Sequence, residues 1–160
     1  MIKKRAQAWG FDLMIAISIF LVGALLFFVY SLNIYENESA KATSMKYEAE
    51  QIGNMLLSEG FPASWNKSNV VKIGLLTENK VNETKISLFY ELSESDYERT
   101  KTLFNTRYHY FFNLSEPILI GNTSVSGIGS VFVNQTDLVK ITRFTIYKNK
   151  PVTANIYLWQ

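Results

Sequence analysis

The feature that most constrains this chain is an uninterrupted apolar run near its N-terminus. Residues 13–32 read LMIAISIFLVGALLFFVYSL and contain no charged side chain. At 1.5 Å per residue, a helix of this length spans about 30 Å, the thickness of the hydrocarbon core of a bilayer. Apolar helices in globular cores are usually shorter and amphipathic, so the run predicts a transmembrane helix, which we place at residues 11–32.

The charges on either side of this helix predict its orientation. The basic cluster Lys3–Arg5 precedes the apolar run, whereas Glu36 and Glu38 follow it. By the positive-inside rule, the leader at residues 1–10 stays in the cytoplasm and the C-terminal part is exported. A cleavable secretory signal has an apolar core of about 7–15 residues followed by an A-x-A pattern, and this chain has neither. We therefore expect a single-pass protein of the cell membrane.

The junction between the leader and the apolar helix has a pattern of its own. Lys4–Ala6 is followed by Gln7, and Asp12 opens the apolar helix. Here the chain resembles the class III signal peptide of archaeal type IV pilin-like proteins, in which a prepilin peptidase cuts before the apolar helix. The resemblance implies that this helix stays in the mature protein as both anchor and packing element.

Two cleavage positions are compatible with the resemblance. The archaeal pattern places the cut between Ala6 and Gln7, and a bacterial-type reading places it after Gly10, so that Phe11 becomes the first residue. Related proteins commonly carry an acidic residue fifth after the cut. Asp12 is sixth after the first position and second after the other, so the sequence departs from the pattern in both cases.

Asp12 has two interpretations. A carboxylate that enters an apolar helix is costly unless it is paired or lies near the interface. The resemblance implies an assembly role, in which this carboxylate neutralises the free amine of a neighbouring subunit. The alternative is an interfacial N-cap, which satisfies free backbone N–H groups at the start of the helix and needs no partner.

Helical periodicity continues beyond the apolar run, and we expect an amphipathic helical stalk at residues 33–60. Gly60 and Pro62 are the predicted stop signals. An arrangement with an apolar first half and a striped second half is also how a type IV pilin is built, in which the second half packs on the sheet of the outer domain. The apolar stripe is spaced by three and four residues and comprises Ala42, Met45, Ala49, Ile52 and Leu56.

The remaining residues, 61–160, predict an extracellular β-rich domain. Residues 138–147 and 152–159 are rich in β-branched and aromatic side chains and flank Lys148–Pro151, which indicates a hairpin. Ser95–Glu98 has capping-box spacing and predicts one short helix through about Phe104. The fold class is therefore α+β, with a small, mainly antiparallel sheet. Further strands are predicted at residues 70–76, 85–92, 108–112, 118–120 and 130–133.

Asn-x-Ser/Thr sequons are frequent on the side predicted to be exported. Their number exceeds the roughly two expected by chance from the composition, which favours a glycosylated surface protein. The candidate glycosylation sites are Asn37, Asn66, Asn82, Asn113, Asn122 and Asn134.

The sequence does not predict an enzyme. His109 is the only histidine and alternates with aromatic residues in a predicted strand, and cysteine is absent, so we expect no catalytic residue, metal site or cofactor. The glycines of Ser124–Gly129 lack the flanking elements of a dinucleotide site and predict a loop. The acidic residues of 91–98 crowd a helix start and match no calcium loop. Lys and Arg are scattered, which excludes a nucleic-acid footprint.

Two functions follow from these observations. The first is a pilin-like structural subunit of an archaeal surface filament, used for adhesion or a related task and anchored in the membrane before assembly. Its expected partners are membrane lipid, prepilin peptidase and like pilin subunits. The alternative is a membrane-tethered extracellular binding or adhesion module that never polymerises.

Overall fold

The computed structural model describes residues 3–131, 133 and 137–160, with the side chains of residues 3–9 and 33–39 outside the description. The chain forms two compact units, which meet between Lys41 and Ala42. Helix α1 (Lys3–Leu56) supplies the first unit and the opening element of the second. Residues 42–56 of the predicted stalk therefore belong to the second unit.

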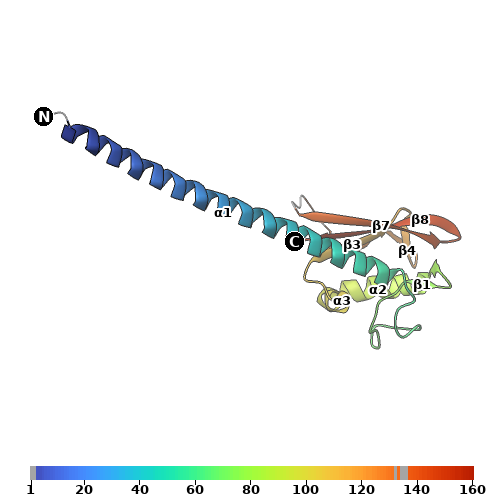
Figure 1. Ribbon diagram of the computed structural model, residues 1–160. Coiled ribbons are helices and arrows are strands. Elements are labelled where there is room, and N and C mark those ends of the chain that lie inside the picture. Colours follow the sequence, from blue (N-terminus) through green and yellow to red (C-terminus); the bar gives the residue numbers. More distant parts are fainter. Residues whose placement is uncertain (1–2, 132, 134–136) are drawn as a thin grey trace. The chain divides into compact units, whose positions relative to one another are not determined.

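The second unit is built on one antiparallel sheet (Figure 1). Its strand order is β6-β3-β8-β7, and two short ribbons, β1-β2 and β4-β5, accompany it. The chain is α+β, as predicted, but two helices follow α1 in place of one. The elements are β1 (Leu76–Thr77), β2 (Lys80–Val81), α2 (Glu83–Ser95), α3 (Tyr97–Phe104), β3 (His109–Leu114), β4 (Ile118–Ile120), β5 (Thr123–Val125), β6 (Ile128–Gly129), β7 (Leu138–Tyr147) and β8 (Lys150–Trp159).

The β7–β8 hairpin confirms the strongest strand prediction. Its register pairs Leu138 with Trp159 and Tyr147 with Lys150. The two turn residues, Lys148 and Asn149, have φ values of 50° and 60°. Positive φ at both positions defines the type I′ turn, whose twist matches that of the flanking strands. The predicted bounds of β7 agree with the structure, and β8 begins at Lys150.

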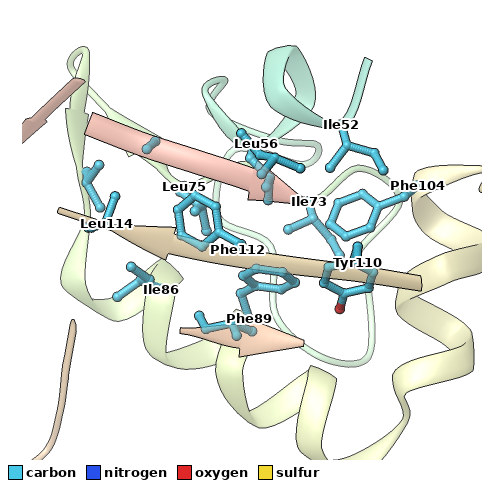
Figure 2. Packing of buried hydrophobic residues seen from close by; sticks show 14 of the residues in the cluster. Ile52, Leu56, Ile73, Leu75, Ile86, Phe89, Phe104, Tyr110, Phe112 and Leu114 are labelled. Atoms are coloured by element: carbon cyan, nitrogen blue, oxygen red, sulfur yellow. The ribbon is translucent and has the colours of Figure 1, made fainter. Parts of the chain in front are cut away.

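One face of the sheet is buried beneath the helices. Alternate residues of β3 and β8, such as Tyr110 and Ile156, are buried because successive side chains of a strand point to opposite faces. Helix α1 covers this face with Ile52 and Leu56, and α2 covers it with Phe89 (Figure 2). The predicted apolar stripe of α1 is buried from Met45 to Leu56, whereas Ala42 is exposed.

The strand predicted at residues 85–92 is wrong, because this segment is helix α2. The Asn82 side chain caps the helix by accepting hydrogen bonds from the backbone N–H groups of Thr84 and Lys85, 2.9 and 3.2 Å away. Its buried residues Ile86 and Phe89 are three positions apart, which is a helical spacing. Aromatic and β-branched content suggested a strand, but the cap and the tertiary burial favour the helix.

Three other boundaries differ from the prediction. Within residues 70–76 only Leu76 belongs to a strand, and Lys72 makes an isolated bridge to Phe61. The described residues of 130–133 lie outside any strand, and the pairing with β3 is made earlier, by β6. The loop predicted at residues 124–129 contains parts of β5 and β6.

The capping positions of two helices also differ from the prediction. Asp96, and not Ser95, caps α3, because its carboxylate accepts the backbone N–H of Arg99 at 3.0 Å. Helix α1 ends at Leu56, before the predicted stop signals. Gly60 lies four residues beyond the end of the helix, where its φ of 77° suits glycine.

Candidate membrane anchor and modification sites

The segment Gly10–Leu32 is long and apolar enough to cross a membrane. Its 23 residues make about 35 Å of helix. The large apolar side chains are exposed around the whole helix, from 49% for Ile17 to 74% for Phe20. Burying one such side chain contributes about 1.5–3 kcal/mol, so this surface is strongly unfavourable in water. Length and composition thus identify one candidate membrane span in the described chain.

The backbone of this segment is suited to an apolar surrounding. An α-helix satisfies its own N–H and C=O groups, which lipid cannot do. The hydroxyl of Ser18 donates to the carbonyl of Met14 at 2.8 Å, so its polar hydrogen is also satisfied within the helix. Gly23 has no heavy atom within 4 Å of the position where a Cβ would stand, and it leaves an open notch on the surface.

Asp12 lies inside α1 and is exposed. Because the helix begins at Lys3, Asp12 does not cap it, and the N-cap interpretation is wrong for the full-length chain. Among the described residues, Asp12 has no hydrogen bond or ion pair. A lone carboxylate on an apolar helix is costly in lipid unless a cation approaches it. The geometry therefore leaves this carboxylate available to a partner from outside the chain.

The predicted processing residues lie on the same helix. Ala6 and Gln7 are in the helical backbone ahead of the apolar segment, and their side chains fall outside the description. Gly10 and Phe11 are exposed at the start of the apolar segment. The structure does not select between the two cleavage positions, which stay predictions.

Two sequons have exposed asparagines. Asn66 is in an irregular segment, where its side-chain carbonyl accepts the backbone N–H groups of Ser68 and Asn69. Asn122 lies in the turn between β4 and β5 and is exposed. Both asparagines are exposed, and the Asn66 contacts use only its carbonyl oxygen, so a glycan on the amide nitrogen can be attached without opening the fold.

Two other sequons are part of the folded structure. Besides capping α2, Asn82 donates from its amide to the Thr77 hydroxyl at 3.2 Å. Asn113 lies in β3, where its carbonyl accepts the Asn155 amide at 3.0 Å. We therefore expect glycosylation at these positions to disturb local contacts. Asn37 and Asn134 lie outside the described side chains.

A buried hydroxyl cluster escaped sequence reasoning. The Tyr110 hydroxyl lies 2.6 Å from the Thr100 hydroxyl and 3.2 Å from the Ser93 hydroxyl. Burial raises the pKa of Tyr110 to about 12, against the opposing effect of these two hydrogen bonds. The residues come from α2, α3 and β3, and no local motif joins them. The cluster satisfies the Tyr110 hydroxyl within the core, which is a structural role.

The Tyr97 hydroxyl completes the sheet beside this cluster. It accepts the backbone N–H of Tyr110 at 2.9 Å and donates to the carbonyl of the same residue at 3.3 Å. Burial raises the pKa of Tyr97. The hydroxyl therefore adds to the pairing on the β6 side of β3, where the Tyr110 carbonyl also accepts the backbone N–H of Ser130 at 3.0 Å.

The other polar groups singled out in the sequence are used separately. His109 lies between the rings of Tyr97 and Trp159, with centroids 6.1 and 5.9 Å away. The acidic residues of 91–98 are used separately: Glu91 pairs with Lys67 at 2.6 Å and Glu98 with Lys101 at 3.3 Å. No group of three metal-binding side chains occurs in the described part of the chain.

A polar surface hollow lies between α1 and the end of α3. This groove of about 560 Å³ contains Glu48, Lys101 and Arg107. Thr106 donates to the Glu48 carboxylate at 2.7 Å, and the Arg107 guanidinium donates to the Tyr108 hydroxyl at 3.1 Å. That hydrogen bond raises the pKa of Arg107. The Glu48 carboxylate and the Arg107 guanidinium are therefore both engaged in contacts within the protein.

Comparison with protein-family models, with curated proteins and with solved structures finds no match in any of the three.

Proposed function

We propose that this protein is a pilin-like structural subunit of an archaeal surface filament, held in the membrane by its N-terminal helix before assembly. The observation that carries the proposal is the exposed apolar surface of Gly10–Leu32. Such a surface needs either lipid or the corresponding helices of other subunits. A helix that first anchors the precursor and later packs in a filament core meets both needs in turn.

The position of Asp12 supports the same proposal. Its carboxylate is exposed at the start of the apolar segment and has no partner among the described residues. Cleavage after Ala6 or after Gly10 creates a new amino group on the same stretch of helix. In an assembly of parallel helices, the amino group of one subunit can neutralise the Asp12 carboxylate of its neighbour, which removes a large cost in an apolar surrounding.

The buried stripe of α1 supports the second part of the proposal. From Met45 to Leu56 the helix is fixed to the sheet of the outer unit. The helix that carries the apolar segment therefore also supplies a core element of the folded second unit. This continuity suits a subunit that displays a folded domain on the surface of a helical core.

The N-terminus of the mature protein tests the proposal. The protein is isolated from membranes of cells with an active prepilin peptidase, and its N-terminal peptide is identified by mass spectrometry. We expect the chain to begin at Gln7 or Phe11. An intact Met1 would refute processing and would favour the non-polymerising tethered module.

A matched substitution separates these two functions. Asp12→Asn keeps the size of the side chain and removes its charge. We expect this variant to reach the membrane and to fail in filament formation. If filaments form as in the parent chain, the assembly role of Asp12 is wrong.

A further inference from the structure

Strand β7 is the last strand on one side of the four-stranded sheet and has no hydrogen-bonded neighbour there among the described residues, although β2 passes close to it. The outward-facing side chains of Leu138, Phe144 and Ile146 are 41%, 84% and 39% exposed. Lys140 and Thr142 lie between them on the same face, because alternate residues of a strand share a face. An edge strand with apolar side chains on its open face is a template for pairing with another strand.

The backbone of β7 is available on the same side. Tyr147 and Lys150 flank the two-residue turn and form a hydrogen-bonded pair. The alternation of an antiparallel ladder then directs the odd-numbered residues of β7 toward β8 and the even-numbered residues toward the open edge. Within the described chain, no backbone hydrogen bond uses that side of the strand.

A groove runs beside the last part of this edge. Its volume is about 430 Å³, and its lining is mostly apolar, with Leu57 and Leu76 facing Phe144, Ile146 and Pro151. An aliphatic side chain brought in by a strand that pairs with β7 would enter this groove.

We propose that β7 pairs antiparallel with β7 of a second copy of this chain, about a two-fold axis at Thr142. In this register Leu138 of one copy lies opposite Ile146 of the other, Lys140 lies opposite Phe144, and Thr142 faces its own equivalent. The five outward positions read apolar, cationic, hydroxyl, aromatic and apolar. This order is self-complementary under reversal, which is what a two-fold interface requires.

Each part of this pairing is favourable. Where two opposed residues both point their backbone N–H and C=O groups to the edge, they form two N–H···O hydrogen bonds with each other. Opposed aliphatic pairs each add about 0.2–1 kcal/mol. The Thr142 hydroxyl already donates to the Asn155 side-chain carbonyl in its own sheet, at 2.9 Å. Leu138 of the second copy reaches the groove beside Ile146, and Phe144 loses its contact with water.

The charges of β7 do not prevent the pairing. The ammonium of Lys140 lies 5.3 Å from the centre of the Tyr157 ring in its own sheet, so it is held over the sheet face and away from the edge. Arg143 lies opposite Ile141 of the second copy, which keeps the two arginines about 7–8 Å apart on the diagonal.

Single cysteines test this register, because the chain has no cysteine of its own. The full-length protein is purified in a non-ionic detergent, and Thr142→Cys is oxidised under mild conditions. Directly opposite hydrogen-bonded residues have Cα atoms about 5.5 Å apart, within the range of a disulfide. We expect a disulfide-linked dimer. Ser64→Cys, an exposed position outside the sheet, is the matched control and should stay monomeric.

A second pair of variants checks the direction of the strands. Leu138→Cys alone should not form a dimer, whereas a mixture of Leu138→Cys and Ile146→Cys should form a mixed dimer. Phe144→Glu, added to Thr142→Cys, should lower the dimer yield at least tenfold. Equal yields from Thr142→Cys and Ser64→Cys, or a Thr142→Cys yield that Phe144→Glu leaves unchanged, would overturn the pairing.

This pairing requires neither N-terminal cleavage nor packing of the apolar helices. The N-terminal peptide is measured on the same samples, so that the two proposals are judged separately. A dimer with an intact Met1 would contradict only the processed subunit, and a processed chain without the dimer would contradict only the β7 contact.

Discussion

Gly53 gives a quantitative test of how α1 packs in the second unit. It is buried in the last part of α1, against β7 and β8. A Cβ at this position would lie 3.5 Å from Ile156 Cδ1, 3.9 Å from Arg143 Cγ and 4.0 Å from Ile141 Cγ2. These are ordinary contact distances, so a methyl group fits and a larger side chain does not.

The two substitutions at Gly53 should therefore have opposite effects on stability. Gly53→Ala gains about 1 kcal/mol of helix propensity and up to about 0.8 kcal/mol from the buried methyl group. Gly53→Leu has a similar propensity gain, but overpacking against three side chains costs about 1–3 kcal/mol. We expect the alanine variant to be more stable than the parent chain and the leucine variant to be less stable.

The assay is thermal unfolding in detergent, followed by tryptophan fluorescence, because Trp65 and Trp159 are buried in the outer unit. One kcal/mol corresponds to about 4 °C in the midpoint for a domain of this size. Gly23→Ala and Gly23→Leu serve as controls, since Gly23 has open space around it and both should leave the transition unchanged. A leucine variant at Gly53 as stable as the alanine variant would refute the packing of α1 on the sheet.

Three further predictions concern the Asn82 cap of α2, the buried Tyr110 and the candidate glycosylation sites. Asn82→Ala should lower the unfolding free energy by about 1 kcal/mol, and Asn82→Asp should restore most of it, as measured by denaturant titration. Because the pKa of Tyr110 is raised from 10 to about 12, its neutral form is favoured by folding. Its contribution to the free energy of unfolding is complete below pH 10 and is lost between about pH 10 and 12. Tyr110→Phe should therefore lose less stability over this range than the parent chain. The same dependence of stability on pH in both proteins would contradict the assignment. Glycopeptide mass spectrometry should find Asn66 and Asn122 more highly occupied than Asn82 and Asn113, and the reverse order would contradict the role of exposure.

The sequence predicts those elements whose signal is local. The length of the apolar run can be compared directly with the thickness of a bilayer. The β7–β8 hairpin is recognised from two strand-like segments on either side of a turn sequence. The stripe from Met45 to Leu56 also follows from periodicity, because the spacing alone defines the buried face of a helix.

The elements that failed depend on distant residues. Helix α2 contains Ile86 and Phe89, whose residue types suit a strand equally well. The segment is a helix because this conformation buries both side chains against the sheet. The Tyr97 hydroxyl meets the Tyr110 backbone only because β3 returns beside α3. For the candidate membrane span, length and composition were sufficient. The open edge of β7 could not be predicted, because its position in the sheet depends on the order of all four strands.

Cysteine labelling in intact cells measures directly whether the N-terminal helix is embedded. Ala24→Cys places a thiol in the middle of the apolar segment, and Ser64→Cys places one on the outer unit; both positions are exposed in the isolated chain. With a membrane-impermeant maleimide, we expect Ser64→Cys to be labelled and Ala24→Cys to remain unlabelled until the protein is denatured. Labelling of Ala24→Cys in intact cells at the rate of Ser64→Cys would contradict the membrane anchor.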